Sequence, residues 1–174
     1  MARRALRFDP IAEARRQWID HGWPEGADGM ALVTSVMRAH QILLARVDDA
    51  LAPLGLTFAR YEALMLLTFS RAGGLPLGKI GQRLQVHPAS VTNVIDRLER
   101  DGMVKRTRHP TDQRTTLAVL TTKGRRAAER ATKVLNTEVF ERTNLSTPLL
   151  GALFDALADL RLAAGDFVVD DGRG

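Results

Sequence analysis

The sequence predicts a mainly α-helical protein with one small β-hairpin near residue 110. Apolar residues recur at helical spacing over most of the 174 residues. Only two short runs, 103–109 and 114–120, alternate between apolar and polar side chains, as half-buried strands do. The chain is 45% hydrophobic and 26% charged. This composition suits one compact domain of about 150 residues with an arm.

Composition also excludes several classes of protein. The chain has no cysteine, which removes disulfides, thiolate nucleophiles and cysteine-based zinc sites. No apolar run approaches the roughly 18 residues of a membrane helix, and the basic start is not followed by an apolar signal segment. We therefore expect a soluble, cytoplasmic protein with no membrane partner.

The N-terminal third is expected to hold three helices. Asp9 followed by proline starts a short helix that ends at Gly22, and the glycine-containing stretch 22–29 is predicted to be a linker. A long helix with an a/d-like apolar stripe then runs until Pro53. Thr57 is the predicted cap of the third helix, which ends before a glycine pair.

The next segment has the pattern of a helix-turn-helix. Leu77–Leu84 forms a short helix, Gln85–Val86 a tight turn, and a second helix begins at His87–Pro88 and runs to Asp101. Apolar residues of this second helix share an inward stripe. Its outward face is small and polar first and basic later, as in a helix that reads base edges and meets phosphates. The outward residues are Ala89, Ser90, Thr92, Asn93, Arg97 and Arg100.

The two alternating runs form a basic hairpin directly behind this unit, which is the arrangement of a wing. Arg108, His109 and Arg114 cluster at its tip, where they are positioned to enter a minor groove. Residues 79–130 hold 12 Lys/Arg and 5 Asp/Glu, a charge of +7, whereas the rest of the chain carries 13 against 15. Such a concentration is the electrostatic footprint of a nucleic-acid surface, although a solvated basic face would look the same.

Two further helices are expected at the C-terminal end. Thr121 or Thr122 caps the first, which runs to about Thr143, and Ser146 caps the second. The last helix carries more leucine than a lone surface helix needs. We therefore expect the terminal helices to form a homodimer interface.

Residues 56–130 resemble the winged helix-turn-helix of the MarR family of transcription regulators. The resemblance lies in the run Asp112-Gln-Arg-Thr-Thr-Leu-Ala-Val-Leu-Thr-Thr-Lys-Gly124, placed behind His-Pro-Ala-Ser-Val-Thr-Asn. It implies a homodimer that binds double-stranded palindromic operator DNA and, in many members, releases it on binding a small molecule. The DNA-binding residues expected from the motif, the basic wing tip included, are Ser90, Thr92, Asn93, Arg97, Arg108, Asp112 and Arg114. In the family, the wing aspartate orients the wing arginine.

The N-terminal helix with its tryptophan is similar to the subgroup that responds to urate or regulates aconitate metabolism. That similarity makes Trp18, Glu62 and Arg106 candidate ligand-binding residues. Two of the four pocket positions depart from the urate pattern, namely Glu62 and Asn93. A small organic anion such as citrate or aconitate is therefore favoured over urate itself. On sequence alone, a core position is the default interpretation of Trp18, and the alternative to a pocket for Glu62 and Arg106 is an ordinary ion pair.

The sequence thus predicts a winged helix-turn-helix with a helical dimerisation region. The expected divisions are an arm and linker at 1–29, dimerisation helices at 30–56 and 122–165, a DNA-binding domain at 57–121, and a flexible tail at 166–174. No catalytic constellation, metal-ligand spacing or cofactor motif is present. We expect a repressor attenuated by an organic anion, not an enzyme. The alternative is a winged-helix interaction or architectural module without a ligand.

Overall fold

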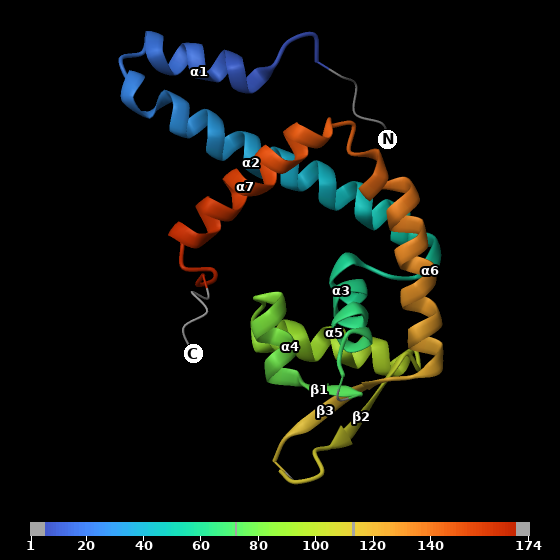
Figure 1. The fold of residues 1–174 in the computed structure, drawn as a ribbon. Helices are drawn as coiled ribbons and strands as arrows, with labels where there is room; N and C mark the ends of the chain where they lie inside the picture. The colour runs from blue at the N-terminus through green and yellow to red at the C-terminus, as the bar shows by residue number, and fades with distance from the viewer. Residues whose placement is uncertain (1–5, 72, 113, 170–174) are drawn as a thin grey trace. The chain divides into compact units, whose positions relative to one another are not determined.

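A computed structural model describes residues 6–71, 73–112 and 114–169. The chain divides into two compact units, Met1–Val139 and Phe140–Gly174. Helices of the first unit are α1 (Pro10–Asp20), α2 (Pro24–Leu51), α3 (Phe58–Thr68), α4 (Leu77–Leu84), α5 (Pro88–Arg100) and α6 (Thr122–Glu138), with the short 3-10 turn η1 (Ala52–Leu54) (Figure 1). The second unit holds η2 (Phe140–Arg142) and α7 (Thr147–Ala163).

The predicted fold class is confirmed, with one strand more than the sequence indicated. Strands β2 (Val104–Arg108) and β3 (Thr116–Leu120) form the antiparallel hairpin, and β1 (Gly74–Pro76) adds to the other edge of β3. The β1 segment is three residues long and contains glycine and proline, so it has the composition of a turn. A Cβ on Gly74 would lie 2.9 Å from the Val119 side chain, so this edge pairing depends on glycine.

The linker predicted over 22–29 is wrong, because α2 already begins at Pro24. The break between α1 and α2 is confined to residues 21–23, where Gly22 has a φ of +86°. The Trp18 and Trp23 rings meet edge to face at 5.3 Å, and a Cβ on Gly26 would lie 3.6 Å from Trp18 Nε1. Packing across this tight turn offsets the low helix propensity of the glycines, and α1 lies along the first part of α2 (Figure 1).

The start of α3 is capped from outside the helix. Thr57 occupies the N-cap position as predicted, but its side chain makes no capping hydrogen bond. The backbone N–H of Phe58 instead donates to Asp48 Oδ1 of α2, at 3.1 Å. A carboxylate at a helix start also meets the positive end of the helix dipole. The cap thereby joins α2 to α3.

One apolar core holds the helix-turn-helix, the sheet and the scaffold helices together. Its largest fully buried side chains come from α2, α3, α4, α5, β2 and α6, and they are Leu51, Leu64, Ile80, Ile95, Leu98, Val104 and Leu135. Gly124 allows α6 to lie against the start of β2, since a Cβ there would be 2.0 Å from the Met103 carbonyl oxygen. The helix-turn-helix and the sheet thus share one core with α2 and α6.

The last helices follow the predicted order, with α6 ending at Glu138 rather than near Thr143. Ser146 is the N-cap residue of α7, although its side chain makes no capping bond. None of the α7 side chains is buried within a single chain. In the predicted tail, residues 170–174 lie outside the described residues. No helix in the described part of the chain is long and apolar enough to span a membrane.

Candidate nucleic-acid interface

Helices α4 and α5 form the helix-turn-helix that the sequence predicts. Gln85 ends α4 in the left-handed conformation, with φ of 52°, and Val86 N donates to Gly81 O at 3.2 Å. A Cβ on Gly81 would lie 3.1 Å from the Val91 side chain. Glycine at this position therefore lets α4 and α5 approach each other closely.

The outward face of α5 is exposed along its whole length. Val91, Ile95 and Leu98 are buried against the core, whereas the predicted reading residues Ser90, Thr92, Asn93 and Arg97 are exposed. His87 caps the helix, its Nδ1 accepting from Ala89 N at 3.2 Å. This periodicity turns the polar side of α5 to solvent, as a recognition helix requires.

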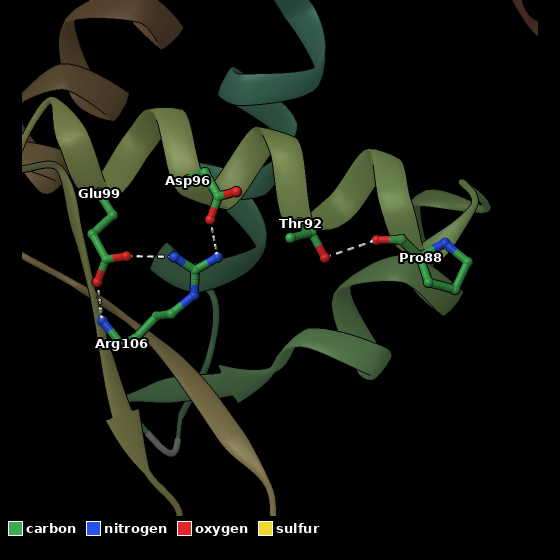
Figure 2. Close-up of polar contacts among 5 residues, drawn as sticks. All are labelled: Pro88, Thr92, Asp96, Glu99 and Arg106. Atoms are coloured by element: carbon green, nitrogen blue, oxygen red, sulfur yellow. Dashed lines mark hydrogen bonds and ion pairs between the residues drawn. The ribbon is translucent and has the colours of Figure 1, made fainter.

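Thr92 has a restricted chemistry on this face. Its hydroxyl donates to the Pro88 carbonyl oxygen at 3.1 Å, one turn back along α5 (Figure 2). The hydroxyl hydrogen is therefore used within the helix. What Thr92 offers to a partner is an acceptor oxygen and a methyl group, which suit a base amino group or a thymine methyl.

The wing tip is shaped by Asp112. Its carboxylate accepts from Arg114 N at 3.0 Å and from Thr115 Oγ1 at 2.6 Å. The hydrogen bond from Thr115, followed by that from the Arg114 backbone, holds the pKa of Asp112 below its usual value. The predicted aspartate–arginine relation is thus made through the Arg114 backbone, and the Arg114 side chain is exposed. Arg108 is the last residue of β2 and is also exposed.

Arg106 ties the first strand of the wing to α5. Its Nη1 pairs with Glu99, its Nη2 lies 2.5 Å from Asp96 Oδ1, and its backbone N donates to Glu99 Oε1 at 3.0 Å (Figure 2). Burial lowers the pKa of Arg106, but hydrogen bonds to Asp96 and Glu99 outweigh this effect and raise it. The guanidinium therefore stays charged while bridging two carboxylates.

A second arginine fixes the other side of the same helix end. The Arg60 side chain of α3 is 11% exposed, pairs through Nη2 with Asp101, and donates through Nη1 to Gly55 O at 2.7 Å. Its buried Nε has no hydrogen-bond partner. Asp101 is the C-cap residue of α5. Arg60 thus links the end of the recognition helix to the turn that follows α2.

The three predicted ligand residues do not meet within one chain. Glu62 is half-buried on α3, and this burial raises its pKa. Arg106 is engaged by α5 acids rather than by Glu62. Trp18 packs at the N-terminal end of α2, whereas Glu62 follows the C-terminal end of that 28-residue helix. At 1.5 Å per residue, α2 spans about 40 Å between them.

Arg60 and the acids Asp96, Glu99 and Asp101 were not among the predicted site residues. The sequence signal for the acids is that Asp96 and Glu99 lie in the arginine-bearing second half of α5 and that Asp101 follows its last residue. Their partners come from α3 and β2, which periodicity within α5 does not reveal. Across the described residues, no group of three or more His, Asp or Glu side chains is placed to hold a metal ion.

Comparisons with known proteins agree with this architecture. Residues 56–116 match the model of the MarR family. The HTH-type transcriptional repressor Rv2887 of Mycobacterium tuberculosis (strain ATCC 25618 / H37Rv) is 33% identical over 109 residues, which are 63% of this chain and 77% of that protein.

Two solved structures are also similar. The MarR family transcriptional regulator Sco5413 from Streptomyces coelicolor is 51% identical, with a TM-score of 0.74, covering 82% of this chain and 99% of that chain. The transcriptional repressor CouR, a protein of Rhodococcus jostii RHA1, bound to a 23-mer DNA duplex, is 30% identical, with a TM-score of 0.68, covering 72% and 89%.

Proposed function

The chain belongs to the MarR family and is a DNA-binding transcription regulator, not an enzyme, and from this premise we propose that it represses by binding a palindromic operator as a homodimer. The division proposed is an arm at 1–29, dimerisation helices at 30–56 and 122–165, and a DNA-binding domain at 57–121. The arm boundary falls inside α2, so the arm and the scaffold share a continuous helix.

The observation that carries this proposal is the exposed polar and basic surface of α5 and the wing. Short polar side chains near the start of α5 suit base edges, and arginine further along suits phosphate. The wing arginine sits on a turn that Asp112 shapes, which suits insertion into a minor groove. We assign DNA contacts to Ser90, Thr92, Asn93, Arg97, Arg108, Asp112 and Arg114.

Arg114→Ala tests whether Arg114 contributes to sequence-specific binding or only to electrostatic attraction to any DNA. We expect it to weaken operator binding by about 1–3 kcal/mol and to weaken random DNA less, as for an arginine that reads a groove. Lys79→Ala is the matched control, because an exposed cation that meets only phosphate contributes almost equally on all sequences. Fluorescence anisotropy with both duplexes measures this. Equal losses on operator and random DNA for Arg114→Ala would contradict the assignment.

Homodimerisation is supported by apolar side chains that a single chain leaves in solvent. They lie on α2 and α7 and include Leu32, Val33, Met37, Ile42, Leu149, Leu153 and Phe154. Large exposed apolar surfaces on a single chain mark interaction sites. Sedimentation at micromolar concentration should give twice the chain mass of 19.2 kDa. An inverted repeat with half-site centres one helical turn apart should lie beside the gene.

We assign the effector to the class of small organic anions, with citrate, aconitate and urate as probes. Arg106 offers a partly exposed guanidinium, which suits a carboxylate, and Glu62 has a raised pKa and takes up a proton readily. An anion must compete with Asp96 and Glu99 for Arg106. A site that also contains Trp18 needs that tryptophan from a second copy of the chain, because the length of α2 separates Trp18 from Glu62 within one chain.

The effector test is release of operator DNA by each anion, measured for the wild type and for Trp18→Ala. An effector typically changes DNA affinity by a coupling energy of about 1–3 kcal/mol. Release from the wild type, and its loss in the variant, supports the assignment. Operator binding that no anion weakens would favour the alternative, an architectural module without a ligand.

A further inference from the structure

The second half of α5 mixes acids and bases in a way that a DNA-binding helix should not tolerate. Asp96, Glu99 and Asp101 lie near its C-terminal end, next to exposed Arg97 and Arg100. Carboxylates at a helix C-terminus oppose the helix dipole. They also repel DNA phosphates and attract Arg97 and Arg100, which are placed to bind those phosphates. Left to themselves, these acids would weaken DNA binding.

Spacing within α5 favours the harmful pairing. Asp96 and Arg100 are four residues apart with the acid first, the orientation that forms ion pairs on an isolated helix. The structure shows a different arrangement. Arg106 of β2 binds both Asp96 and Glu99 (Figure 2), and Arg60 of α3 binds Asp101.

This arrangement leaves the two exposed arginines of α5, Arg97 and Arg100, unpaired among the described residues. Within the described part of the chain, neither Arg97 nor Arg100 makes an ion pair. The Arg106 side chain is only 25% exposed, so its stem and head are largely occupied by the contact with α5. The acids of the helix are thus neutralised from the protein side, and the bases face outward.

We propose that Arg106 is a positioning residue for DNA binding, which holds Asp96 and Glu99 and thereby keeps Arg97 and Arg100 available to DNA phosphates. Arg106 acts through the two carboxylates and needs no contact with DNA itself. The inference rests on the proposed function, namely that α5 faces the operator. It assigns to the wing strand a role in shaping the charge of the recognition helix.

Arg106→Ala is the first test. With the guanidinium gone, Asp96 is free to pair with Arg100, and Glu99 loses its counter-ion beside the DNA. We expect operator affinity to fall about tenfold at about 0.1 M salt, with random DNA weakened to a similar extent. The slope of log affinity against log salt should become shallower by about 0.9 for each DNA phosphate that the variant no longer neutralises.

Neutralising the two acids distinguishes this role from a direct contact or a structural one. In an Asp96→Asn/Glu99→Gln background, Arg106→Ala should change operator affinity and salt slope by less than about twofold, because nothing remains to capture Arg100. Arg106→Ala that costs the same in both backgrounds would show a direct DNA contact and overturn the proposal. Arg71→Ala, which removes one exposed charge outside this cluster, serves as the control for net charge.

The acid variant alone keeps the test decisive if Arg106→Ala fails to fold. Asp96→Asn/Glu99→Gln should bind operator as tightly as the wild type or more tightly, and a loss of fivefold or more would overturn the proposal. Arg97→Ala reports on the proposed function separately. Unchanged operator affinity in Arg97→Ala would mean that α5 does not face the DNA. If Arg97→Ala loses affinity, but Arg106→Ala costs the same affinity in the wild type and in the Asp96→Asn/Glu99→Gln background, only the positioning role is refuted.

Discussion

Gly124→Ala offers a sharp test of how α6 is mounted on the wing. An added Cβ would lie 2.0 Å from the Met103 carbonyl oxygen and 2.8 Å from a Leu120 methyl. Backbone atoms approach a real Cβ no closer than 3.0 Å, so the helix and the strand start must separate by about 1 Å. Alanine therefore cannot be accommodated by a side-chain rotation.

The cost follows from the bonds that this separation strains. The Met103 carbonyl oxygen accepts from Thr121 N at 3.1 Å and from Thr121 Oγ1 at 3.0 Å. Losing both hydrogen bonds costs about 2 kcal/mol, and the forced displacement adds about 1–3 kcal/mol. Alanine recovers about 1 kcal/mol of helix propensity. We expect the free energy of unfolding to fall by about 2–4 kcal/mol in total.

Urea unfolding followed by circular dichroism measures this change. Gly78→Ala in α4 is the matched control, since no atom lies within 4 Å of its Cβ position. That variant should be unchanged or up to about 1 kcal/mol more stable. If Gly124→Ala behaves like Gly78→Ala, the described packing of α6 against the start of β2 is refuted.

Three further outcomes follow from α3. Asp48→Ala should lower the free energy of unfolding by about 0.5–2 kcal/mol, because Asp48 caps α3. The Thr57 side chain makes no capping hydrogen bond, so Thr57→Ala should change the free energy of unfolding little. Equal losses for the two variants in urea unfolding would contradict the assignment of the cap to Asp48. Tyr61→Phe removes the 3.0 Å hydrogen bond to Thr132 and should cost about 0.5–1.5 kcal/mol in the same assay, whereas no change would mean that the bond adds nothing. Burial raises the pKa of Glu62 above its ordinary 4.5, so the folded state holds the proton longer and stability should fall as pH rises through the raised pKa. Glu62→Gln should remove that fall in unfolding measurements between about pH 4 and 7, and a fall that persists in the variant would assign it to another group.

Local structure was predictable wherever a few neighbouring residues decide it. The helix-turn-helix, the hairpin and the caps at Asp9 and Thr121 all appear as expected. The linker over 22–29 was wrong because two tryptophan rings stabilise the turn, so the glycines that follow remain helical. The third strand was missed since its pairing energy comes from β3, more than 40 residues later.

By itself, the sequence determined the order of the helices and of the two hairpin strands, the polar face of α5 and the basic charge of residues 79–130, because periodicity, turn residues and charge depend on short segments of chain. Only the tertiary structure decided which arginine meets which acid. Arg60 pairs with Asp101, 41 residues away in the sequence. Asp96 pairs with Arg106 rather than with Arg100, which is nearer in the sequence. Such choices depend on where the core places β2 and α3 against α5, and packing of distant residues is not encoded in local spacing.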